Sequence, residues 1–194
     1  MSTVQAPYGL RAVNELGGLP YAGSTRTFLI DPAGTASNMY NGTVVAVNTS
    51  GYLYPVTNVG SNADPFPAGV VGVFVGCSYV NAQGQQIYAQ YYPTGTTGVV
   101  TAYVVDDDRT VFQVQANGSL GQTALGANVV FSAAQTGSTS TGNSTTAVST
   151  TLAATATIAF KVVGFASGPG DAYTDLLVKF NVGSHAYNTG LGVA

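Results

Sequence analysis

Two runs of β-branched and aromatic residues flank a tight turn in the sequence NGTVVAVNTSGYLYPV, residues 41–56. Such runs are typical of strands, and Ser50-Gly51 is a typical turn pair. A third run, AGVVGVFVG at residues 68–76, follows a loop that contains two prolines. Its internal glycines, Gly72 and Gly76, indicate β-bulges or the close approach of another backbone, as at a barrel corner. We therefore predict a strand–turn–strand–loop–strand unit that begins a small barrel.

The rest of the chain continues this β pattern. No segment has a sustained apolar repeat of 3.6 residues, and Gly- and Asn-containing turns separate many short strand-like runs. This pattern predicts an all-β fold, either a small antiparallel β-barrel or a β-sandwich, with a jelly roll as one form. The predicted strands are Arg26–Ile30, Thr43–Asn48, Val70–Cys77, Gln85–Tyr92, Gly98–Val105, Thr110–Gln115, Ala127–Phe131, Ile158–Phe165 and Ala172–Asn181.

The two ends of the predicted domain organisation differ in character. Residues 1–25 are too apolar for a disordered tail and too rich in Gly and Pro for a helix. We predict an extended N-terminal arm that lies on another surface, with an arm wrapped on its own domain as the alternative. Residues 26–194 form the predicted β-rich body.

One segment of the body has an unusual composition. Residues 132–157 contain 14 Ser and Thr among 26 residues and no charged residue. A flexible linker, a long surface loop and a strand that pairs with a neighbouring subunit all agree with this composition. We favour a long loop with some contact between subunits.

The low charge of the chain points to assembly. Charged residues make up 7% of its 194 residues, against about 25% in typical soluble domains. Its 13 charges over an expected surface of roughly 8,600 Å² leave about one per 660 Å². We infer that neighbouring molecules cover much of this surface.

Several function classes are unlikely on composition alone. Five Lys and Arg residues are too few to neutralise a nucleic-acid backbone, so we expect no nucleic-acid partner. The most apolar runs, Val70–Cys77 and Val99–Val105, are far shorter than a membrane span, so we expect no membrane partner. The N-terminus lacks the basic and apolar regions of a secretory signal.

The chain offers few residues for catalysis. Its only histidine, His185, lies near Asp171 and Asp175, but no Gly-x-Ser-x-Gly motif marks a nucleophile. We therefore expect no enzyme and no catalytic residue. The single cysteine, Cys77, lies in an apolar run and is expected to be an inert buried thiol.

Binding motifs are equally sparse. Asp106-Asp107-Asp108 lacks the spaced pattern of a calcium loop and is expected to form a solvated turn. We expect no metal and no cofactor. The tyrosines Tyr88, Tyr91 and Tyr92 fit strand and interface positions better than a carbohydrate-stacking platform.

Five stretches of the sequence carry a resemblance to a known family. The chain resembles head decoration (cement) proteins of tailed bacteriophages, of the cyanophage and marine phage type, over about residues 6–131. The stretches are Ala6–Arg11, Gly17–Gly23, Tyr40–Val45, Val71–Tyr79 and Gln90–Pro93.

This resemblance implies a virion protein on the outer capsid surface. Its partners would be the major capsid protein and further copies of itself, often as a homotrimer, and it would clamp neighbouring capsid subunits. Tyr8, Leu10 and Arg11 are the expected capsid contacts of the arm, because they join an aromatic side chain, an aliphatic one and the arm's only cation. The alternative is a receptor- or glycan-binding module of a head fibre or tail, which would use the exposed tyrosines.

Overall fold

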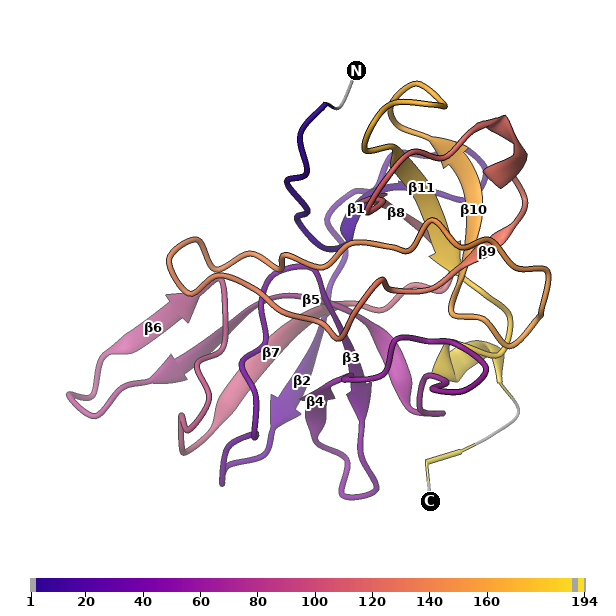
Figure 1. The fold of residues 1–194 in the computed structure, drawn as a ribbon. Coiled ribbons are helices and arrows are strands. Elements are labelled where there is room, and N and C mark those ends of the chain that lie inside the picture. The colour runs from indigo at the N-terminus through magenta and orange to yellow at the C-terminus, as the bar shows by residue number, and fades with distance from the viewer. Residues whose placement is uncertain (1–2, 190–191, 194) are drawn as a thin grey trace.

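The computed structural model describes residues 3–189 and 192–193. Within these residues the strands form two sheets, which lie one above the other in Figure 1. The predicted all-β fold is confirmed, and it contains a closed barrel. The strands are β1 (Arg11–Glu15), β2 (Arg26–Ile30), β3 (Thr43–Val47), β4 (Leu53–Pro55), β5 (Val70–Val80), β6 (Gln86–Ala89), β7 (Val100–Val105), β8 (Thr110–Gln115), β9 (Asn128–Val129), β10 (Phe160–Phe165) and β11 (Asp175–Phe180). Two 3₁₀ turns, η1 (Gln122–Ala124) and η2 (Ala186–Asn188), complete the regular elements.

The first sheet closes into a barrel of five strands in the order β3-β4-β2-β7-β5. Pairing of β3 with β5 completes the ring, and β6 extends the sheet beyond it by pairing with the end of β5. The neighbours are antiparallel except β2 and β4, which meet in a parallel bridge between Ile30 and Leu53. The unit predicted from residues 41–76 is thus β3, β4 and the first half of β5.

The glycines of β5 lie where the strand bends. The register shifts beside Gly72 in the pairing with β3, and again between Phe74 and Gly76 in the pairing with β7. Gly72 has a φ of +147°, and a Cβ there would collide with the carbonyl oxygen of Val105. The predicted bulge and close backbone approach are confirmed at this position.

The second sheet is open and antiparallel, in the order β1-β8-β11-β10-β9. It packs on one side of the barrel, and the strand β3 shows how the two layers share residues. Val45 points into the barrel, whereas its neighbours Val44 and Ala46 point outward into the core between the barrel and the second sheet. Alternation along one strand therefore supplies two separate hydrophobic cores.

The N-terminal segment is part of this second sheet. Strand β1 lies within residues 1–25 and pairs with β8, with Arg11 opposite Gln113. Over residues 9–15 the segment is therefore wrapped on its own domain, which is the alternative, and docking on another molecule stays a prediction. The cause is the side chain of Leu10, which is 1% exposed in the core between the sheets.

The Ser/Thr-rich segment contains no strand, as a long loop predicts, but it is tied to both sheets. In Figure 1 it is the orange trace that crosses the molecule between them. Asn143 bridges Asn41 next to the barrel, and Val148 bridges Ala116 after β8. The Gln135 side chain accepts from the Val44 N–H (2.7 Å) and donates to the Val56 carbonyl (2.7 Å). These contacts are within the chain; the predicted contact between subunits stays a prediction.

Strand ends differ from the prediction where other segments compete for the backbone. The strand predicted at Ala127–Phe131 shortens to Asn128–Val129, because Phe131 bridges Val148 of the Ser/Thr-rich segment. The strand predicted at Gln85–Tyr92 shortens to β6, and Tyr92 exchanges backbone hydrogen bonds with Met39. The predictions that include residues 1, 2, 190, 191 and 194 lie at these positions outside the described residues.

Candidate functional site

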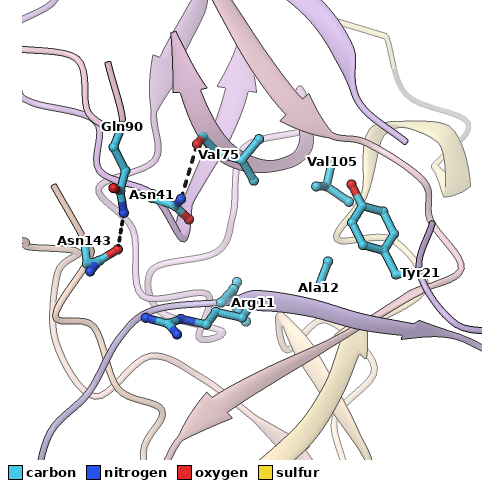
Figure 2. Close-up of a pocket in the computed structure, with 9 residues that line it drawn as sticks. Arg11, Ala12, Tyr21, Asn41, Val75, Gln90, Val105 and Asn143 are labelled. Atoms are coloured by element: carbon cyan, nitrogen blue, oxygen red, sulfur yellow. Dashed lines mark hydrogen bonds between the residues drawn. The ribbon is translucent and has the colours of Figure 1, made fainter. Parts of the chain in front are cut away.

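A groove of about 390 Å³ lies between β1 and the barrel, and Figure 2 shows the residues around it. It forms where the open sheet meets the outer side of β5 and β7. Side chains from distant parts of the chain converge there: Leu10, Arg11, Ala12, Tyr21, Asn41, Val75, Gln90, Val105 and Asn143.

One end of the groove is polar. Gln90 Nε2 donates to Asn143 Oδ1 (2.6 Å), and Asn41 Nδ2 donates to the Val75 carbonyl (3.2 Å), as the dashed lines in Figure 2 mark. The exposed Arg11 lies below these amides and is the single charged residue of the lining. This end presents amide groups and one guanidinium to solvent, which suits hydrogen bonding to peptide groups or to a carboxylate.

The other end of the groove is apolar. Ala12, Val105 and the ring of Tyr21 lie there in Figure 2. The Tyr21 hydroxyl donates to the Ser24 carbonyl (2.6 Å), which holds the ring in place. Burial, and to a lesser extent the charge of Asp106, raises the pKa of this hydroxyl, so it stays protonated as a donor.

Of the three residues expected to contact a capsid, the structure places Tyr8 and Arg11 against each other and encloses Leu10 in the core. Arg11 is exposed in the groove, with its guanidinium 4.8 Å from the centre of the Tyr8 ring. Tyr8 is half-buried and its hydroxyl donates to Asp175 Oδ1 (2.8 Å). Burial and this hydrogen bond raise the pKa of Tyr8. Leu10 is enclosed in the protein's own core, so its expected role as a surface contact is incorrect.

A second surface feature is the outer face of the barrel formed by β2, β7, β5 and β6. Register places Leu29, Thr101, Ser78 and Tyr88 in one row across these strands. Leu29 is 50% exposed and Tyr88 is 76% exposed, and Val80 and Val99 are exposed nearby. The open sheet covers a different side of the barrel, where β3 faces it. We call the surface of Leu29, Val80, Tyr88 and Val99 the outer barrel face.

The outer barrel face carries no charge, because the chain has no charged residue from Pro65 to Val105 and only Thr27 and Leu29 of β2 point to this side. Most surfaces of free monomers intersperse charges of both signs. An uncharged surface that exposes several large apolar side chains, here separated by Thr101 and Ser78, is one that a protein partner can cover.

The tyrosines near β6 do not form a common platform. Tyr92 is fully buried in the barrel core, where its hydroxyl donates to the Thr96 carbonyl (2.8 Å). Tyr91 stacks on Tyr40, with ring centres 5.8 Å apart. Tyr88 alone of the three is widely exposed. The sugar-stacking surface on which the glycan-binding alternative depended is therefore not formed by these side chains.

His185 is a core residue. It is fully buried, its Nδ1 accepts from the Tyr187 N–H (3.3 Å), and its Nε2 therefore carries the proton that it donates to the Val71 carbonyl (3.0 Å). Burial lowers the pKa of this imidazole, although the nearby carboxylates of Asp106, Asp107 and Asp108 oppose the shift. Both ring nitrogens are occupied by structural hydrogen bonds.

The three consecutive aspartates, Asp106 to Asp108, lie in the turn between β7 and β8. Asp106 pairs with Arg26 (2.9 Å), and Asp107 Oδ1 accepts from the Arg109 N–H (2.7 Å) in the turn before β8. In the described part of the chain, no three His, Cys, Asp or Glu side chains are placed to hold a metal ion. Cys77 is buried in the barrel, and burial raises its pKa to about 12.

Sequence reasoning did not identify the groove. Asn41, Gln90 and Asn143 are far apart in the chain, and each is one of many amides in Gly- and Thr-rich turns. Their convergence depends on the Ser/Thr-rich segment lying beside residues 41 and 90, which no local pattern signals.

Comparisons with protein-family models, curated proteins and solved structures found no match to this chain. Among the described residues no helix is long and apolar enough to cross a bilayer.

Proposed function

We propose that the protein is a structural component of a virion, a head decoration protein that binds the outer surface of a phage capsid. The observation that carries this proposal is the uncharged outer barrel face, with Leu29 50% and Val99 72% exposed. Covering these side chains removes apolar area from water, which stabilises a contact by about 25 cal/mol per Å² before the costs of association.

The resemblance to head decoration proteins supports the choice of a capsid as partner. Two of the stretches that carry it, Val71–Tyr79 and Gln90–Pro93, lie in β5 and directly after β6. Ser78 of the first stretch lies in the row of residues that crosses the outer barrel face, whereas Gln90 lines the groove and Tyr92 lies in the barrel core. A decoration protein acts in many copies, so a modest contact per copy adds up over the capsid lattice.

Copy number in purified virions tests this proposal first. Quantitative mass spectrometry against the major capsid protein is expected to give a ratio near one to one or another lattice-wide stoichiometry. A few copies per particle would indicate a fibre or tail component instead. Absence from the particle would overturn the proposal.

A matched pair of variants tests the contact surface. Leu29 and Leu125 are exposed to the same extent, 50% and 49%, but only Leu29 lies on the outer barrel face. Leu29→Glu is expected to reduce co-sedimentation with capsids that lack the protein at least tenfold, because it places a charge in the contact. Leu125→Glu is the control and should bind as the wild type does. Equal binding of both variants would contradict the proposed surface.

A further inference from the structure

Strand β6 is an exposed edge of the barrel sheet. It pairs with β5 on one side, from Cys77 opposite Ala89 to Val80 opposite Gln86. On its other side, no backbone hydrogen bond from any described residue reaches Gln86–Ala89. Figure 1 shows that the hairpin of β5 and β6 projects away from the rest of the barrel. This edge is therefore accessible to another strand.

The hydrogen-bond phase of the hairpin identifies the backbone groups that are unpaired. The Asn81 N–H donates to the Gln85 carbonyl (2.9 Å), so these two residues are a hydrogen-bonded pair. Such pairs alternate along antiparallel strands, which makes Tyr79 with Ile87 the next hydrogen-bonded pair. The N–H and C=O groups of Gln86 and Tyr88 consequently point away from β5. Tyr92 lies an even number of residues further along, so its N–H and C=O are also expected to point away from β5. Both of these groups are hydrogen-bonded to Met39.

This edge has one of the features that usually limit edge-to-edge pairing, a short length of four residues, and lacks the others. Natural edge strands are protected by short length, Lys, Pro, bulges or inward-pointing charges. The sequence of β6 is Gln-Ile-Tyr-Ala, its pairing with β5 is regular, and the hairpin has no charged residue. Two copies of this hairpin can therefore approach each other without electrostatic repulsion.

We propose that β6 pairs antiparallel with β6 of a second copy, around a two-fold axis at Ile87. In this register Gln86 lies opposite Tyr88 of the second copy, and Tyr88 lies opposite Gln86 of the second copy. Both are hydrogen-bonded pairs, so all four unpaired N–H and C=O groups of each edge find partners. The unpaired backbone groups belong to Gln86 and Tyr88, so these two residues must lie opposite each other in the two copies. A two-fold axis at Ile87 produces this register.

The pairing also joins the apolar surfaces of the two copies. Tyr88 shares a face with Ser78 and belongs to the outer barrel face. A sheet continued through β6 would place the outer barrel faces of both copies on the same side. The two Ile87 side chains would meet on the opposite side as a non-hydrogen-bonded pair, where side chains approach most closely. The occupant of this edge is thus a second copy of the chain; the inference does not rest on the proposed capsid role.

A pair of charge variants tests the register. Gln86→Lys with Tyr88→Lys places like charges opposite each other twice, whereas Gln86→Lys with Tyr88→Glu places opposite charges there. Analytical ultracentrifugation of the purified protein is expected to show a concentration-dependent dimer for the wild type and for the Lys/Glu variant. The Lys/Lys variant is expected to weaken dimerisation at least tenfold. Circular dichroism and thermal unfolding establish that both variants are folded.

Cross-linking tests the position of the axis. Facing Cα atoms of a non-hydrogen-bonded pair are about 4.5 Å apart, which suits a disulfide. Ile87→Cys is expected to form disulfide-linked dimers under mild oxidation at least tenfold faster than Val99→Cys, an exposed control outside the edge. The native Cys77 is buried and is present in both variants, so any cross-linking through it is the same in the two proteins.

The following results would overturn the proposed pairing of β6 with β6 of a second copy. A wild type that stays monomeric at the highest concentration, with equal cross-linking at positions 87 and 99, excludes it. A trimer, or equal association of the Lys/Lys and Lys/Glu variants, shows that copies meet through another surface. Virion copy number is a separate measurement, so failure of the dimer and failure of the capsid proposal are distinguishable.

Discussion

At the scale of single residues, Leu10 anchors the N-terminal segment to the core between the two sheets. Its side chain is 1% exposed, so Leu10→Ala removes buried apolar atoms and leaves a cavity. We expect a loss of about 2–5 kcal/mol in the free energy of unfolding, measured by chemical denaturation. Leu19→Ala is the matched control, because Leu19 is 65% exposed, and it should change stability by less than about 0.5 kcal/mol. Similar losses for both variants would contradict the described packing.

His185 predicts a pH dependence of stability. Burial lowers the pKa of its imidazole in the folded state, so the unfolded chain binds the proton more readily. The stability is complete above the unfolded pKa of about 6.5 and falls as the pH drops through that value towards the lower folded pKa. We expect a lower free energy of unfolding at pH 5 than at pH 7.5, measured by denaturant titration.

The variant His185→Gln isolates this contribution. A glutamine amide retains a donor for the Val71 carbonyl and an acceptor for the Tyr187 N–H but does not titrate. The variant should therefore lose less stability between pH 7.5 and pH 5 than the wild type does. An identical loss in both proteins would assign the pH dependence to groups other than His185.

At the scale of elements, the N-terminal segment is attached to the rest of the protein at two places, one at Val4 and Ala6 and the other at Leu10 and β1. At Val4 and Ala6 the attachment is the Gln115 side chain, which accepts from the Ala6 N–H (2.8 Å) and donates to the Val4 carbonyl (3.3 Å). Further along the chain, the attachment is the burial of Leu10 and the pairing of β1 with β8. Deletion of residues 1–5 removes the hydrogen bond to Val4 and is expected to lower the free energy of unfolding by about 1 kcal/mol, the value of one hydrogen bond.

Deletion of residues 1–25 has a different expected result. It removes a strand of the open sheet and a core residue, so we expect loss of cooperative unfolding, measured by thermal melting and by near-ultraviolet circular dichroism. A deletion protein that melts like the full chain would show that β1 is not an integral strand.

Individual elements also show how far the sequence could predict the fold. Strands β2 and β8 begin and end where the alternating apolar pattern and the flanking turns place them. Strand β1 was not predicted, because Arg-Ala-Val-Asn-Glu is short and its apolar neighbours are broken by glycines and a proline. Its partner β8 lies about 100 residues later, and pairing at such a distance leaves no local signal.

At the scale of the whole molecule, the all-β fold was predictable with a barrel or a sandwich as its form, and the arrangement of two layers was not. Bulge glycines in β5 mark a barrel corner in the sequence itself, whereas the open sheet combines strands from both ends of the chain. The outer barrel face follows from alternation once the register is known. The groove at Arg11 does not, because Asn41, Gln90 and Asn143 meet only after both layers and the Ser/Thr-rich segment are in place.

The course of the Ser/Thr-rich segment has a consequence for how the chain folds. Gln135 bonds the backbone at Val44 and Val56, and Asn143 bridges Asn41, so these contacts join residues that are 79 to 102 positions apart in the chain. Chains dominated by such distant contacts close large loops before they gain stabilising interactions, and they fold in roughly milliseconds to seconds. During synthesis, barrel strands emerge well before residues 135–143. The Val44 N–H and the Val56 carbonyl therefore lack their Gln135 partner until the middle of the second half of the chain has left the ribosome.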